Sequence, residues 1–235
     1  MLTGFYLSLH IMTEQIGRAT QLHDENIEFC IGGYMTREQQ KELKALKTAL
    51  PKMVQTEIKK FKLKKKDFMV WFQKEGLFFD LMISVCERDG RCYCNSVERL
   101  KPLWIDELLW DLLGMPENKK EAASLRAIGA FTVYGPPICK LETELVCWEL
   151  EELEKCVTAY IEHFYQDIQS CGMDHFQEYT DKEPYHRELR KALSLVHDGQ
   201  YQDAVDHISA FGRGSFCNKG IWINDAIIEY CKGNL

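Results

Sequence analysis

The chain has 235 residues and a formal net charge of −7, and 46% of its residues are apolar and 28% charged. This balance excludes a wholly disordered chain, and no uncharged run reaches the ~20 residues that a membrane-spanning helix needs. The negative net charge disfavours a nucleic-acid-binding protein, because contact with phosphates requires a basic surface.

The beginning of the chain lacks a regular pattern. Residues 1–34 show no clean helical or strand period and close at Gly32-Gly33, just before a much more regular segment. We interpret them as an N-terminal extension. An α+β core domain is expected over residues 35–172, and a helical C-terminal subdomain packed on that core over residues 173–235.

A helix is predicted at the start of the core domain. Thr36 and Gln39 have the spacing of a capping box, in which the threonine oxygen accepts from an early amide and the glutamine reaches back. Pro51 is expected to end or bend this helix, because proline lacks an amide hydrogen and clashes with the preceding turn. Apolar residues on one helical face support the prediction: Leu43, Leu46, Leu50, Val54, Ile58 and Phe61.

An antiparallel sheet of about four strands is predicted next. Aromatic and branched residues indicate strands over residues 68–72, 77–87 and 92–97. Asp89-Gly90 suits the two-residue turn of a hairpin, because both central residues of that turn need positive φ. A fourth strand is expected over residues 125–134, before Gly135.

Helices are predicted for most of the remaining chain. Pro102 suits the first turn of a helix over residues 103–113, and a long amphipathic helix is expected from Leu141 to Ile168, ended by Gly172. Shorter helices should run from Pro184 to just before Gly199, over residues 201–208 and over residues 222–230. The expected fold class is α+β, with a helical C-terminal extension.

Ten cysteines raise the question of disulfides or metal. No secretory leader is evident before them, so we expect reduced thiols and a cytoplasmic location. Cys86, Cys92 and Cys94 are closely spaced, but no Cys-x-x-Cys pair occurs, and Cys92 and Cys94 should share one strand face as buried residues. We therefore predict no metal site among them.

Complete catalytic and cofactor signatures are absent from the sequence. Gly212 to Ser215 lacks the strand-turn-helix context of a nucleophile elbow, and no phosphate-binding glycine loop occurs. Cys171, His175 and His163 could converge on a metal if one helix continued through them, but Gly172 indicates a break. The sequence thus predicts no catalytic residue, no cofactor and no metal ligand.

Charge is distributed unevenly along the chain. Residues 41–66 hold ten lysines against Glu42 and Glu57, a surplus of eight positive charges that leaves about −15 for the rest. Charged stretches of this kind are usually solvated, and lysines at the end of a helix can offset the negative end of its dipole. The lysine stretch could also pair with the acidic residues elsewhere in the chain. The weak candidates for partner binding are Lys62, Lys64 and Lys65 together with Glu149, Glu151 and Glu152.

Three segments carry a resemblance to a known family. Phe61 to Lys66 with the strand pair after it, Leu109 to Met115 and Leu125 to Phe131 are similar to a bacterial family, domain of unknown function 4304. The resemblance covers roughly residues 36–165. The family has no established activity or catalytic residues to carry over to this chain, and by analogy the resemblance suggests an immunity or defence partner of a secreted toxin.

We therefore expect a non-catalytic, cytoplasmic protein-binding module that is immunity-like or defence-related, with a protein partner, no membrane and no nucleic acid. The alternative is an enzyme whose site is assembled from dispersed residues, with His163, His175, His186, Glu178 and Asp181 as candidates. A third hypothesis, nucleic-acid binding by the lysine tract, predicts steep weakening with salt.

Overall fold

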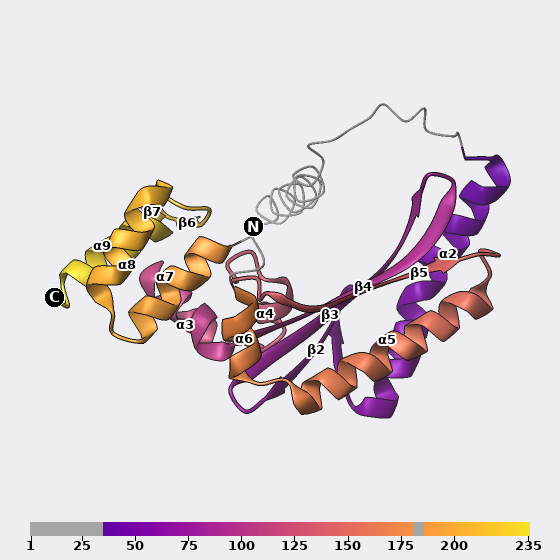
Figure 1. The fold of residues 1–235 in the computed structure, drawn as a ribbon, viewed down its shortest axis with the longest axis horizontal. Coiled ribbons are helices and arrows are strands. Elements are labelled where there is room, and N and C mark those ends of the chain that lie inside the picture. Colours follow the sequence, from indigo (N-terminus) through magenta and orange to yellow (C-terminus); the bar gives the residue numbers. More distant parts are fainter. Residues whose placement is uncertain (1–34, 181–185) are drawn as a thin grey trace. The chain divides into compact units, whose positions relative to one another are not determined.

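The computed structural model describes residues 35–180 and 186–235. The predicted extension over residues 1–34, Asp181 and Pro184 lie outside the described residues. The described chain combines helices with an antiparallel sheet and ends in helices, which confirms the α+β class (Figure 1).

The first described helix, α2 (Arg37–Glu57), begins with the predicted capping box. The Thr36 Oγ1 accepts from the Gln39 amide at 3.1 Å, and the Thr36 amide donates to Gln39 Oε1 at 2.9 Å. Of the two outcomes expected at Pro51, an end of the helix is wrong, because α2 continues through Pro51 to Glu57, as the apolar face predicted. Leu46 and Val54 are buried on either side of Pro51, so packing of this face holds the helix together.

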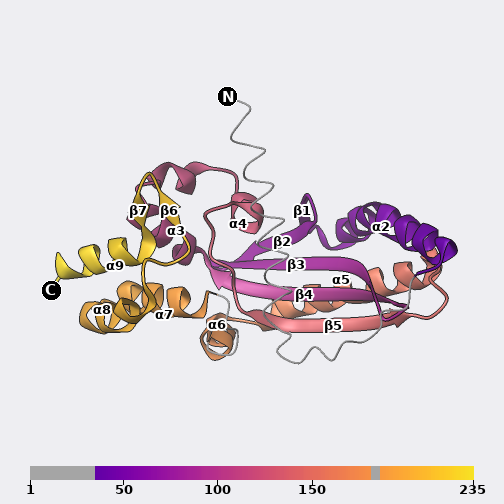
Figure 2. The same ribbon diagram turned by 90° about the horizontal axis from the view of Figure 1, so that it is seen from above.

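Five strands form the sheet in the order β1-β2-β3-β4-β5, and every neighbouring pair is antiparallel. The strands are β1 (Lys64–Lys66), β2 (Met69–Lys74), β3 (Leu77–Arg88), β4 (Arg91–Pro102) and β5 (Pro137–Leu145). The β3–β4 hairpin turns at Asp89 and Gly90, whose φ angles of 55° and 75° confirm the predicted turn. Figure 2 shows β3, β4 and β5 running side by side, with α5 behind them.

Two sequence-based assignments between β4 and α5 are wrong. Residues 125–134 form the short helix α4 (Leu125–Ile128) and an irregular segment. The fifth strand is β5, whose second half, from Leu141, the sequence analysis predicts as the start of the long helix. Leu141 and Leu145 are four residues apart, a spacing that keeps two side chains on one face of a strand as well as of a helix. The antiparallel register with β4 decides between the two.

The remaining elements are mostly helical. They are α3 (Leu103–Leu112), η2 (Pro116–Lys120), α5 (Leu150–Ser170), α6 (Met173–Thr180), α7 (Arg187–His197), α8 (Tyr201–Ile208), η3 (Ser209–Phe211), the strand pair β6 (Cys217–Asn218) and β7 (Ile221–Trp222), and α9 (Ile223–Lys232). A short 3-10 turn, η1 (Ile58–Phe61), links α2 to β1. One hydrophobic cluster includes residues from α2 through to α9.

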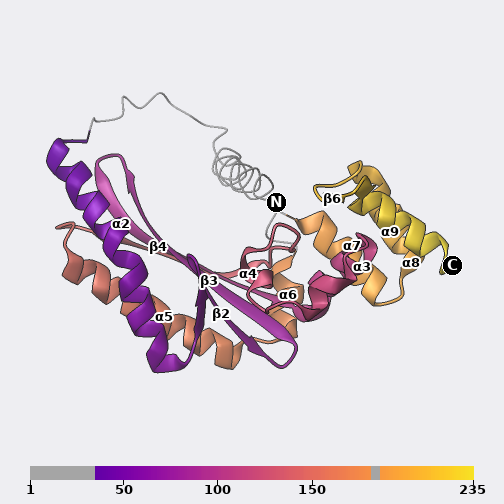
Figure 3. The same cartoon turned by 180° about the vertical axis from the view of Figure 1, so that it is seen from behind.

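The two faces of the sheet are covered differently. α2 and α5 pack on one face, here called the inner face, where Phe79, Leu81 and Cys94 join the main core (Figures 1 and 3). On the opposite, outer face, Trp71 stacks on Phe78 in a second cluster that includes a residue of α4. Alternating side chains along each strand therefore enter different environments.

The predicted packing of the strand cysteines is confirmed. Cys92 and Cys94 are fully buried on the inner face. Cys86 lies on the outer face, since the neighbouring Val85 faces inward opposite Cys94, and its sulfur accepts from Asn95 Nδ2 at 3.1 Å. The three thiols consequently do not converge on one point.

Candidate functional site

The predicted lysine candidates lie at one edge of the sheet. Lys62 follows η1 with a left-handed φ of 57°, and Lys64 and Lys65 belong to the edge strand β1. The Lys64 ammonium is 4.9 Å from the centre of the Trp71 ring. Lysines on a short edge strand also prevent pairing with other chains, so the fold gives these residues a structural role.

A row of exposed lysines continues along α2. Lys41, Lys44, Lys52 and Lys59 recur at helical spacing and are exposed. With Ala45, Thr48 and Ala49, the first three of them line a shallow hollow on α2. A second hollow of about 260 Å³ between α2 and α5 shares Ala49 and Lys52 with the first.

We call seven lysines of this region the basic surface; they are the exposed Lys41, Lys44, Lys52, Lys59, Lys62 and Lys64, together with the half-buried Lys65. Within residues 35–180 and 186–235, none of them has an ion pair with a carboxylate. Their charges are therefore available for an external partner.

The acidic candidates are engaged at the start of α5. Glu149 occupies the N-cap position, and Glu151 and Glu152 lie in the first turn, where negative charge is favourable. The Glu152 carboxylate accepts from the Cys147 amide at 2.9 Å, and Glu151 pairs with Lys155 at 2.8 Å. No ion pair among the described residues joins these glutamates to the basic surface.

The catalytic candidates that the structure describes do not form one site, and Asp181 lies outside the described residues. His175 Nδ1 accepts from the Gly172 amide at 3.1 Å and lies 3.0 Å from Asp174, at the break between α5 and α6 that Gly172 indicates. His186 Nδ1 accepts from the Tyr134 amide, and burial together with the positive charges of Arg190 and Lys101 lowers its pKa to about 3. Glu178 is exposed on α6.

The remaining described candidate, His163, lies beside two residues that the sequence did not indicate as site residues. Glu98 on β4 pairs in register with Cys139 on β5, and His163 of α5 faces both from above the inner face. The His163 Nδ1 is 3.0 Å from Glu98 Oε1 and 3.8 Å from Asp167 Oδ2. One potential ligand atom from each of Glu98, Cys139 and His163 lies within 4.8 Å of the others. We call these three residues the Glu98 cluster.

The cluster places a carboxyl group in an unusual environment. Glu98 is fully buried, whereas His163 is 39% exposed and opens the cluster to solvent. Burial raises the pKa of Glu98 to about 9, and repulsion by the Asp167 carboxylate acts in the same direction. Burial also raises the pKa of the Cys139 thiol to about 11, so the free thiol is protonated and is not an activated nucleophile at neutral pH.

Glu98 is missed because the predicted third strand ends at Val97. In the structure β4 continues to Pro102, and Cys92, Cys94, Ser96 and Glu98 alternate on the buried inner face. If the predicted strand is extended past Val97, the alternation of side chains places the Glu98 carboxylate on the same face as the buried cysteines. A carboxylate among buried residues is the signal in the sequence that could have identified Glu98. Cys139 has no such signal, since its segment is assigned to a loop before the predicted helix.

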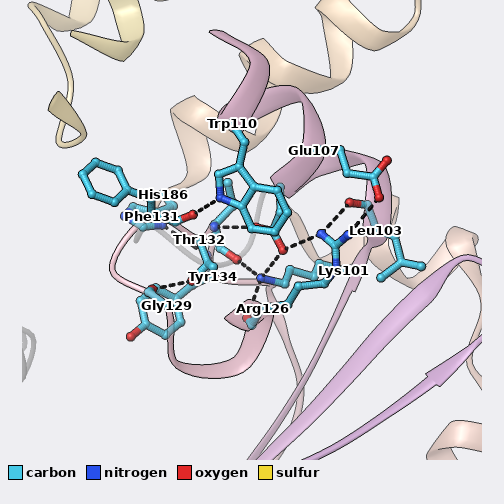
Figure 4. A network of polar contacts seen from close by, with 12 residues as sticks. Lys101, Leu103, Glu107, Trp110, Arg126, Gly129, Phe131, Thr132, Tyr134 and His186 are labelled. Carbon is cyan, nitrogen blue, oxygen red and sulfur yellow. Dashed lines mark hydrogen bonds and ion pairs between the residues drawn. The ribbon is translucent and has the colours of Figure 1, made fainter. Parts of the chain in front are cut away.

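A second buried polar network lies on the outer side of the sheet (Figure 4). Lys101 pairs with Asp106 at 2.8 Å and donates to the carbonyls of Arg126 at 3.0 Å and Val133 at 2.8 Å. The other Asp106 oxygen accepts from the Val133 amide at 2.8 Å. These bonds attach the irregular segment after α4 to β4 and α3, which explains why residues 125–134 form no strand.

No protein-family model matches this chain, and neither the curated proteins nor the solved structures contain a match to it. The resemblance to domain of unknown function 4304 therefore stays a prediction. Among the described helices, none is both long and apolar enough to cross a membrane.

Proposed function

We propose that the protein is a non-catalytic binding module that holds an acidic segment of a protein partner on its basic surface. The observation that carries this proposal is the row of exposed lysines on α2 and η1, which have no carboxylate partner among the described residues and border a hollow lined by small side chains. Unpaired like charges of this kind speed and orient the approach of an oppositely charged partner.

The lining of the hollow on α2 favours a helical partner segment. Ala45, Thr48 and Ala49 are small enough to let another backbone approach α2, while the flanking lysines can reach carboxylates on either side of it. An amphipathic helix with acidic edges has this combination of features. The acidic residues Glu149, Glu151 and Glu152 contribute less in this proposal, because they already serve the start of α5.

A cytoplasmic location is part of the same proposal. All nine described cysteines are free thiols, which is typical of a reducing compartment such as the cytoplasm. An immunity-like or defence-related role, as the family resemblance implies, would supply an acidic patch of a toxin as the partner.

The test uses the full chain and a fluorescently labelled, glutamate-rich peptide with leucines at helical spacing. Fluorescence anisotropy should show binding that weakens as salt rises, and the K41E/K44E/K52E variant should bind at least ~10-fold more weakly, since each lost charge contact costs several tenths of a kcal/mol. The K62E/K64E/K65E variant should show a smaller loss, because these lysines do not line the hollow.

The matched control is K191E/K219E/K232E, which reverses three exposed lysines outside the basic surface and changes the net charge equally. Equal weakening by the control and by K41E/K44E/K52E would contradict the proposal. A labelled single-stranded DNA of similar length provides the comparison with nucleic acid. Tighter binding of the DNA than of the peptide would replace the proposal with nucleic-acid binding.

A further inference from the structure

The Glu98 cluster has a composition that proteins use to bind transition metals. Glu98 offers a carboxylate oxygen, Cys139 a sulfur and His163 an imidazole nitrogen. Sulfur, nitrogen and oxygen donors in one set suit zinc, whereas magnesium and calcium prefer oxygen donors alone. The donor types therefore favour zinc over magnesium and calcium.

The distances between the donors are compatible with a small cation. Their ligand atoms lie within 4.8 Å of one another. Ligands in a tetrahedral zinc site are about 3 to 4 Å apart, given bond lengths of ~2.0 to 2.3 Å. Side-chain rotations that move each atom by about 1 Å would close the cluster around an ion, and the paired strands β4 and β5 hold two of the three donors in register.

An independent observation points to a missing ligand. Glu98 is fully buried, and its Oε2, like Trp71 Nε1 and Ser96 Oγ, has no hydrogen-bond partner among the described residues. Unlike those two atoms, it belongs to a side chain that lies beside two further potential metal ligands, and its Oε1 faces His163. A buried acceptor without a partner costs about 1 to 3 kcal/mol, more if it is charged, so native proteins rarely keep one. A cation between Glu98, Cys139 and His163 would provide the missing contact.

The surroundings can complete the coordination. Asp167, one turn after His163 on α5, has its carboxylate 3.8 Å from the imidazole nitrogen and is 20% exposed. It can supply a fourth oxygen or orient the ring. The exposed edge of His163 gives an ion a path from solvent.

We propose that Glu98, Cys139 and His163 form a binding site for a zinc-class divalent cation between the β4–β5 pair and α5. The ion would join the edge of the sheet to the helix that covers it. This inference does not depend on the binding of an acidic partner, because the basic surface and the Glu98 cluster share no residue.

The experiment uses the full chain, stripped with a chelator, and cobalt(II) as a spectroscopic substitute for zinc. Bound cobalt should show the visible absorption of tetrahedral coordination and the near-ultraviolet absorption of a thiolate ligand, and zinc should displace it. C139S should lose the thiolate absorption, and E98Q and H163Q should each weaken cobalt binding at least ~10-fold, as loss of a ligand or its support does.

Two control variants separate the site from adventitious binding by other residues. C86S removes a thiol on the opposite face of the sheet, and H175Q removes an imidazole that bonds to Gly172 and Asp174. Both should keep the cobalt spectrum of the unaltered protein. Circular dichroism shows whether each variant is folded. Among the three ligand variants C139S, E98Q and H163Q, we expect H163Q to perturb folding least, because the His163 side chain is 39% exposed.

A second measurement covers the case in which C139S or E98Q fails to fold. Zinc should raise the thermal unfolding temperature of the stripped protein, because a ligand that binds only the native state stabilises it. The rise should be absent in H163Q and present in H175Q. An unchanged cobalt spectrum in C139S, no tetrahedral spectrum in the unaltered protein, or an equal zinc-induced rise in H163Q would overturn the proposal.

Discussion

The two faces of the sheet bury charged groups in opposite ways. On the outer face, Lys101 and Asp106 form an ion pair in which the lysine also reaches two carbonyls and the aspartate also receives an amide (Figure 4). Asp106 Oδ2 makes no hydrogen bond among the described residues, but the Lys101 ammonium lies 2.8 Å from it. On the inner face, Glu98 is equally buried, and its Oε2 has neither a hydrogen bond nor an ion pair among the described residues. A buried carboxyl group that faces a cation of the chain indicates a structural role, whereas one with an oxygen that has neither a hydrogen bond nor a cation indicates a site for a ligand.

The largest expected effect comes from breaking the outer network. Lys101→Met should lower the free energy of unfolding by about 3 to 5 kcal/mol, because it leaves Asp106 as an unpaired buried charge and two carbonyls without a donor. Urea unfolding measures the loss. The double variant K101M/D106L should recover part of it, and a double variant less stable than K101M would contradict a role dominated by the buried charge.

A smaller effect should follow from removing one neutral bond of the same network. The indole nitrogen of Trp110 donates to the Phe131 carbonyl at 2.5 Å, and the Arg126 guanidinium lies 4.8 Å from the ring centre. Trp110→Phe should destabilise the protein by about 2 kcal/mol, since it removes the donor and leaves unfilled volume. A change in unfolding free energy below about 0.5 kcal/mol would show that this bond is replaceable.

On the inner face, removal of the buried acidic residue Glu98 should stabilise the metal-free protein instead of destabilising it. Because the folded pKa of Glu98 is raised to about 9 from an ordinary 4.5, the unfolded chain releases this proton more readily. The metal-free protein should therefore lose stability as pH rises above about 4.5, until about pH 9.

Glu98→Gln removes this pH-dependent cost. In chelator at pH 8 it should stabilise the protein by about 1 to 2 kcal/mol, while at pH 4 it should have little effect. Urea unfolding at several pH values gives the comparison, and Asp203→Asn, an exposed carboxylate on α8, is the control. A variant that loses stability equally at both pH values would show that Glu98 is a satisfied structural group.

The smallest effect is expected at the rim of the outer network. Arg126 also pairs with Glu107 at 2.8 Å, but the Glu107 side chain is 40% exposed. Glu107→Gln should change the unfolding free energy by less than about 1 kcal/mol, because solvent screens the pair. A loss of stability as large as that of Lys101→Met would show that the partly exposed Arg126–Glu107 pair contributes as much as the buried Lys101–Asp106 pair, so that burial does not determine the contribution.

Local signals in the sequence determined much of the fold. The capping box at Thr36, the Asp89-Gly90 turn and the alternation of Cys92 and Cys94 each depend on neighbours within a few residues, and the structure confirms them. These features could be predicted because their hydrogen bonds and φ angles are set inside one element.

Only the tertiary structure decided what lies between β4 and α5, and with it the Glu98 cluster. The apolar spacing of Leu141 and Leu145 fits a helix as well as a strand, and pairing with β4 selects the strand. That pairing brings Cys139 beside Glu98, and the packing of α5 adds His163. Contacts between segments far apart in the chain arise from register and packing, which no local pattern of residues contains.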